Sequence, residues 1–139
     1  MSSKYVSSAL EATRVQAEVL DAEARQEIVT RLGARLGVDV TRRAPWDDDA
    51  APNGCLRSDG WELIPKYVGD AICLMFLEGA QTFWKVNNGS DLLRVLKDCP
   101  GLEFYVCDED ARYLLCSNHH DFVMGWGSAG PWVDNLDKA

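Results

Sequence analysis

The feature of the sequence that most constrains the fold is a series of short apolar segments between residues 71 and 127, separated by turn residues. The longest is AICLMFL (71–77), and an uninterrupted apolar run of this length is typical of a strand covered on both faces. The others are QTFWKV (81–86), LEFYVC (102–107), RYLLC (112–116) and DFVMGWG (121–127). Because the turns are short, neighbouring strands should pair antiparallel. The segments therefore predict a four- or five-stranded, mainly antiparallel sheet.

Helical segments lie between and after these strands. Residues 91–99, DLLRVLKDC, place their apolar side chains on one stripe, and Ser90 is expected to cap this helix. Residues 61–70 predict a short helical turn halted by Pro65, and the tail 128–139 predicts a short closing helix. The combination predicts an α+β domain with helices on one face of the sheet.

The N-terminal residues 5–36 are also predicted to be helical, since apolar residues recur mostly every three or four positions. Ser8 and Glu11 have the spacing of a capping box, which would start a helix at Ser8. Asp21 is an alternative cap for a second helix, so one helix and two helices are both compatible with the sequence. Gly33 and Gly37 indicate the end of the segment.

The whole chain, residues 1–139, is expected to form a single α+β domain. A helical segment (1–37) is followed by an irregular connector (38–60) with one short strand at its start, and then by the sheet-forming part (61–139). The connector contains the run Asp47-Asp48-Asp49. Consecutive acids in a loop usually form a solvated surface, and these lack the glycine spacing of a calcium loop.

The formal net charge of −8 points to a partner of opposite sign. Lysine and arginine are too few and too scattered to follow a phosphate backbone, which argues against nucleic-acid binding. Residues 61–139 hold 12 acids and 6 bases, so most of the excess lies in the C-terminal half. An acidic surface attracts basic proteins, although solubility alone would also explain it.

Five cysteines and the absence of a long apolar run bear on the compartment. The number is odd and several cysteines lie within apolar segments, which favours reduced, buried thiols over a disulfide scaffold. The run 71–77 is far too short to cross a bilayer, which needs about 20 residues. The sequence therefore predicts a cytoplasmic protein without a membrane partner.

The stretch CSNHHDF (116–122) holds both histidines of the chain. Cys116, His119, His120 and Asp121 include the residue types of a zinc site or of a thiol hydrolase. Cys107 could add a ligand from the neighbouring strand, but the second pair of ligands usual in structural zinc sites is missing. A nucleophilic cysteine also needs an exposed, positive environment, whereas Cys116 follows an apolar segment of an acidic domain.

A structural interpretation of the same stretch is therefore favoured, with no metal and no cofactor expected. Asn118 would supply the turn geometry, and Asp121 would accept hydrogen bonds from a histidine or from turn amides.

Four tryptophans are candidates for lining a ligand groove, and among them Trp126 is a candidate binding residue. They are Trp61, Trp84, Trp126 and Trp132. Strand tryptophans more often pack a core than line a groove.

The C-terminal part resembles a group of small, largely uncharacterised bacterial proteins. The resemblance rests on YVGD (67–70), FWKV (83–86), the segment 91–108 and LLCSNHHDFVMGWG (114–127), which contains the turn pattern C-x-N-H-H-D after an E-F-Y strand. Proteins of this kind are often grouped with candidate immunity proteins of toxin systems. The resemblance implies that Asn118, His119, His120 and Asp121 form a signature turn without an assigned chemistry.

The leading hypothesis is a non-enzymatic bacterial interaction protein, and the resemblance suggests an immunity protein that binds and blocks a basic toxin enzyme. The expected binding residues are the acidic turn Asp108, Glu109 and Asp110, with the run at 47–49 as an alternative.

Two rival hypotheses remain. One is a small metal- or thiol-dependent enzyme centred on Cys116, His119, His120 and Asp121. The other is a subunit of a larger assembly that docks through its helical segment 5–36.

Overall fold

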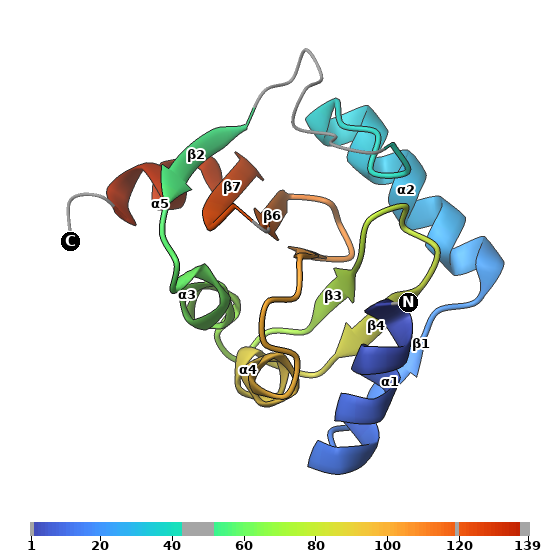
Figure 1. The fold of residues 1–139 in the computed structure, drawn as a ribbon. Coiled ribbons are helices and arrows are strands. Elements are labelled where there is room, and N and C mark those ends of the chain that lie inside the picture. Colours follow the sequence, from blue (N-terminus) through green and yellow to red (C-terminus); the bar gives the residue numbers. More distant parts are fainter. Residues whose placement is uncertain (1, 43–51, 119, 137–139) are drawn as a thin grey trace.

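The computed structural model describes residues 2–42, 52–118 and 120–136 and is an α+β structure (Figure 1). The helices among these residues are α1 (Ser2–Thr13), α2 (Ala22–Leu36), α3 (Gly60–Val68), α4 (Gly89–Lys97) and α5 (Gly130–Leu136). The strands are β1 (Ala17–Val19), β2 (Asn53–Leu56), β3 (Cys73–Phe76), β4 (Phe83–Val86), β5 (Phe104–Cys107), β6 (Tyr113–Ser117) and β7 (Phe122–Gly127). The predicted fold class is confirmed.

All strands belong to one antiparallel sheet with the order β1-β4-β3-β5-β6-β7-β2. The five central strands are those predicted between residues 71 and 127. The sheet has seven strands rather than four or five, because β1 and β2 add an edge strand on each side. The connector contains its strand near its end, at β2, and not at its start, where residues 38–42 form no strand. Asp47, Asp48 and Asp49 lie outside the described residues.

The sheet separates two apolar cores. One face packs against α1, α3, α4 and α5, with Val6, Ile64, Leu92 and Val133 among the buried residues. The opposite face is covered by α2 through Ile28 and Leu32. Figure 1 shows α3 and α4 side by side, with α2 away from them across the sheet. Four of the five described helices thus share one face, and α2 departs from the predicted arrangement because the central strands are apolar on both faces.

The N-terminal segment forms two helices, with β1 between them. Asp21 is the N-cap of α2, and its carboxylate accepts a hydrogen bond of 2.8 Å from the backbone N–H of Ala24. Gly37 ends α2 in the left-handed conformation (φ 69°). Ser8 lies inside α1, which begins at Ser2, so the expected start at Ser8 is wrong. Both α1 and α2 bury apolar residues against the sheet and so belong to the cores, while docking of a partner through their exposed faces stays a hypothesis.

The helix α3 continues through Pro65 instead of ending there, which corrects the sequence expectation. Ile64 and Val68 are both buried, so the apolar stripe of this helix gains more from packing than it loses at one backbone hydrogen bond. The next helix, α4, begins at Gly89 with Asn88 as its cap, not Ser90. The Asn88 side chain accepts a hydrogen bond of 2.8 Å from the Asp91 N–H.

A glycine sets the approach of α3 to α4. A Cβ on Gly89 would lie 2.1 Å from the carbonyl oxygen of Pro65, a distance that no side chain tolerates. The Gly89 N–H also donates a hydrogen bond of 2.7 Å to the carbonyl of Gly69. The two helices are therefore joined through their backbones.

Candidate functional site

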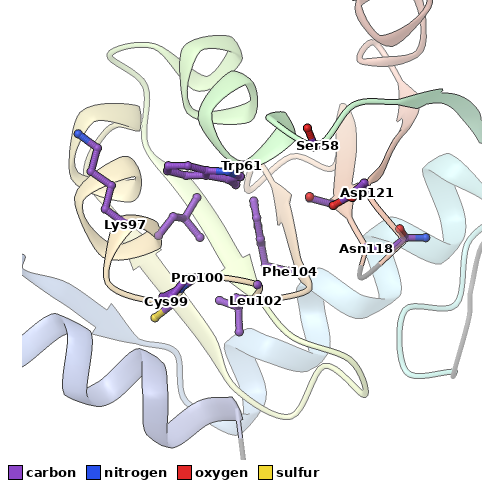
Figure 2. A pocket seen from close by; sticks show the side chains of 12 residues that line it. Ser58, Trp61, Lys97, Cys99, Pro100, Leu102, Phe104, Asn118 and Asp121 are labelled. Atoms are coloured by element: carbon purple, nitrogen blue, oxygen red, sulfur yellow. The ribbon is translucent and has the colours of Figure 1, made fainter.

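A groove of about 280 Å³ lies where α3 begins, α4 ends and the β6–β7 turn passes. We call it the Trp61 groove, and Figure 2 shows the side chains around it. Its lining residues are Ser58, Trp61, Leu96, Lys97, Cys99, Pro100, Gly101, Leu102, Phe104, Ser117, Asn118 and Asp121. Two residues of the predicted signature turn, Asn118 and Asp121, therefore border a cavity.

The β6–β7 turn is held by Asn118, as the sequence predicted. The Asn118 side-chain oxygen accepts hydrogen bonds from the backbone N–H groups of His120 (2.9 Å) and Phe122 (3.0 Å). The Asp121 backbone adopts a positive φ of 63°, and its carbonyl accepts a 2.8 Å hydrogen bond from the Arg57 N–H. This last bond fixes the turn to the segment that leads into α3, on which Ser58 and Trp61 lie.

The Asp121 carboxylate points into the Trp61 groove, whereas the Asn118 amide points away from it (Figure 2). Within the described part of the chain, this carboxylate makes no hydrogen bond or ion pair, so it accepts none of the bonds expected from turn amides, and the alternative bond from His119 lies outside the described residues. His119 lies outside the described residues, and His120 is exposed on the turn. Asp121 is therefore available to a ligand.

The Cys116 thiol lies on the other face of the sheet from the groove. Cys116 is fully buried in the core beneath α2, and burial raises its pKa well above the ordinary value. Its neighbour Ser117 lines the groove because successive side chains of a strand point to opposite faces. A protonated, inaccessible thiol cannot act as the nucleophile of the rival enzyme hypothesis.

No group of three or more His, Cys, Asp or Glu side chains among residues 2–42, 52–118 and 120–136 is arranged to hold a metal ion. Cys107, the additional ligand considered, is fully buried with a raised pKa. All five cysteines are buried, and none of them forms a disulfide within the described part of the chain.

The tryptophans separate into two groups. Trp84 and Trp126 are buried in the two cores, so Trp126 does not face a ligand groove. Trp132 is partly buried and packs against Tyr67, with ring centroids 5.0 Å apart. Trp61 alone of these lines the groove just described, where Phe104 points towards its indole (Figure 2).

One further groove adjoins the Trp61 groove, and a second adjoins that groove at Glu103. The first is bordered by Tyr5, Asp98 and Glu103, and shares Cys99 to Leu102 with the Trp61 groove. The second is bordered by Glu78, Glu103 and Trp84. We call this region the acidic end of the sheet, and define it by Glu78, Asp98, Glu103 and Asp121. Among the residues that the structure describes, Lys97 is the one basic residue that lines any of the three grooves.

The acidic turn Asp108-Glu109-Asp110 lies at the other end of the sheet, where β5 passes into β6. The Asp108 carboxylate is largely buried and accepts hydrogen bonds from the Arg112 backbone N–H (2.7 Å) and from its Nε (2.8 Å). Glu109 forms an ion pair with Lys85 at 3.6 Å, and Asp110 lies 3.8 Å from the Arg112 guanidinium. The turn predicted to bind a basic partner thus has its own bases beside it.

The sequence indicated Trp61 as a candidate for a ligand groove and Asn118 and Asp121 as parts of a turn, but it did not connect them with one another or with Phe104. Their contact depends on β5 pairing with β6, in which Phe104 lies opposite Ser117. The one local signal was the partly polar surroundings of Trp61, which follows Ser58-Asp59-Gly60.

Comparisons of the chain with protein-family models, curated proteins and solved structures found no match. None of the described helices is both long and apolar enough to span a membrane.

Proposed function

We propose that the chain is a non-enzymatic interaction protein that binds a basic protein at the acidic end of the sheet. The observation that supports this proposal is the charge of the three adjoining grooves, which four carboxylates and a single ammonium group line. The turn at 108–110 is less suited to this role than the turn with Asp121, since Arg112 and Lys85 already compensate its carboxylates, whereas Asp121 forms no ion pair within the described residues.

The mechanism combines attraction at long range with aromatic contact. Carboxylates around a groove concentrate a basic partner near it and raise the association rate. Tyr5, which is 60% exposed, and Trp61, which is partly buried, would supply the apolar contact area. The resemblance of residues 67–127 to candidate immunity proteins suggests a basic toxin enzyme as the partner, blocked by occlusion in the bacterial cytoplasm.

The rival proposal of a thiol- or metal-dependent enzyme has less support. It needs Cys116 beside His119, His120 and Asp121, but the Cys116 thiol is buried beneath α2 while Asp121 faces the groove on the opposite side of the sheet.

The test is a comparison of two neutralised variants. The first, E78Q/D98N/E103Q/D121N, removes the four carboxylate charges of the acidic end. The second, E109Q/D110N, removes the two exposed carboxylate charges of the turn at 108–110. Proteins captured from a bacterial lysate by the wild type would be identified and purified, and their association rates measured by surface plasmon resonance at two salt concentrations.

We expect the first variant to associate at least ten times more slowly, with a weaker salt dependence, and the second to stay within twofold of the wild type. A loss in the second variant about half as large as that in the first, on a logarithmic scale, would indicate net charge alone, because the second removes two charges and the first four. An unchanged rate in the first variant would contradict the proposal.

A further inference from the structure

The Trp61 groove combines a carboxylate, an indole ring and two hydroxyl groups, and this combination is specific enough to define a ligand. Asp121 approaches from the β6–β7 turn and points towards the space beside Trp61 (Figure 2). Ser58 and Ser117 add hydroxyl groups from the segment before α3 and from β6. All are acceptors or π surfaces that suit a cation with hydrogen-bond donors.

The basic side chains close to the groove do not occupy the space between Asp121 and Trp61. Arg57 precedes Ser58 in the chain, but its guanidinium donates hydrogen bonds of 3.0 and 2.9 Å to Asp59 and of 2.8 Å to the Leu136 carbonyl. Those bonds hold the pKa of Asp59 below its ordinary value. Lys97 lies at the end of α4, and Figure 2 places its amine on the side of the groove away from Asp121.

Because the turn is fixed by Asn118, the backbone that carries the Asp121 carboxylate is held in place beside the groove. Asn118 bonds the N–H groups on both sides of Asp121, and the Arg57 N–H bonds the Asp121 carbonyl. A planar, fork-shaped cation gains most from a fixed carboxylate, since it can form two parallel hydrogen bonds while it stacks on an aromatic ring.

We propose that the Trp61 groove accepts an arginine side chain of the partner protein, with its guanidinium stacked on Trp61 and hydrogen-bonded to Asp121. This inference rests on the proposed function, of which it specifies the central contact. Arginine fits better than lysine because only the guanidinium is planar and presents several donors at once.

The test uses three short peptides with the full chain, followed by ¹H–¹⁵N NMR. They are acetyl-Gly-Arg-Gly-amide, the same peptide with lysine, and the same peptide with citrulline, which keeps the shape of arginine without its charge. We expect the arginine peptide to shift the Trp61 indole N–H signal saturably, and the citrulline and lysine peptides to bind at least ten and three times more weakly, respectively.

The variant D121N isolates the carboxylate, because asparagine tolerates the positive φ of this position. We expect it to lower the affinity for the arginine peptide at least tenfold, whereas the matched control E109Q leaves it unchanged. Equal affinities for the arginine and citrulline peptides, or an unchanged affinity in D121N, would overturn the inference, as would the absence of a saturable shift.

Measurements with the purified partner separate this inference from the proposed function. If D121N binds the partner normally while the fourfold variant of the acidic end does not, the arginine contact is wrong and the proposed function stands. If neither variant affects the partner, both are wrong.

Discussion

The two turns at the ends of β6 are both polar, but they use their acidic residues differently. Both are polar and acidic, and each is organised by one side chain that bonds backbone N–H groups: Asp108 in the β5–β6 turn and Asn118 in the β6–β7 turn. In the first turn the acid is itself the structural residue and is paired with Arg112. In the second turn the neutral Asn118 amide accepts these hydrogen bonds, and the Asp121 carboxylate remains exposed beside the Trp61 groove.

The difference shows that the number of acids in a turn does not predict a binding surface. What matters is whether the turn also provides the partners of those acids. A carboxylate that accepts hydrogen bonds from its own turn stabilises the fold, and its replacement should lower the free energy of unfolding. A carboxylate without such bonds can be replaced at little cost in stability, so its effect should appear in binding.

The largest expected effect is that of Asp108→Ala. The substitution removes the acceptor of the Arg112 backbone N–H in a largely buried position, and leaving such a group unpaired costs about 1–3 kcal/mol. Urea unfolding would measure the loss. Asp110→Ala, whose carboxylate is 65% exposed, is the matched control and should cost less than about 0.5 kcal/mol. Equal costs would remove the distinction between a structural and a surface acid in this turn.

Alkaline pH acts on β6, the strand that both turns share. Burial raises the pKa of the Cys116 thiol, so the folded protein retains a proton that the unfolded chain releases above about pH 8.5. Stability is therefore full below that pH and falls as the pH rises, by at most about 1.4 kcal/mol per pH unit for each such thiol.

Thermal unfolding between pH 8 and pH 10.5 would show this decline, and Cys116→Ala should reduce its slope. The pKa of Cys73 is raised to about 12 by burial, so a slope remains in that variant. A melting temperature that does not change with pH would show that the thiols are not buried.

Asn118→Ala tests the second turn. It removes the acceptor of two backbone N–H groups at an exposed position, where a comparable cap loses about 1 kcal/mol. Asn118→Asp keeps an acceptor oxygen and should lose less. Both variants can be compared by urea unfolding, and a loss in Asn118→Asp equal to that in Asn118→Ala would argue against a capping role.

The smallest expected effect is a gain in stability in Asp121→Gly. A non-glycine residue at φ 63° is strained by about 1 kcal/mol, and glycine relieves this strain at some entropic cost in the unfolded chain. The net change in the free energy of unfolding should be slightly favourable or close to zero. A clear loss would mean that the Asp121 carboxylate has a structural partner, which would make the two turns alike.

The sequence was informative where apolar residues are dense. The five central strands and α4 can be predicted from apolar runs that are buried on one or both faces, since such runs are compatible with few other secondary structures. The edge strands β1 and β2 were missed or misplaced because each is very short and mostly exposed, and each forms by pairing with a strand far away in sequence.

The candidate sites are harder to predict from the sequence than the fold, because they also depend on which distant segments pair. The Asp108–Arg112 contact spans four residues and could have been inferred from that spacing, which would have identified the first turn as self-compensated. The Trp61 groove has no such local signal. It joins residues from α3, β5 and the β6–β7 turn, and only the register of the sheet brings them together.

The backbone junction of α3 and α4 has a consequence for recognition. Trp61 and Lys97 lie on two helices whose separation is set by the approach of Gly89 to the Pro65 carbonyl and by its hydrogen bond to Gly69. Neither contact involves a side chain that can change its rotamer, so the backbones of α3 and α4 keep a fixed separation on this side of the groove. A ligand would meet this side of the cavity already in its bound shape, and binding would lose little conformational entropy there. Such a groove selects among partners by steric fit, and it rejects those that would need the two helices to separate.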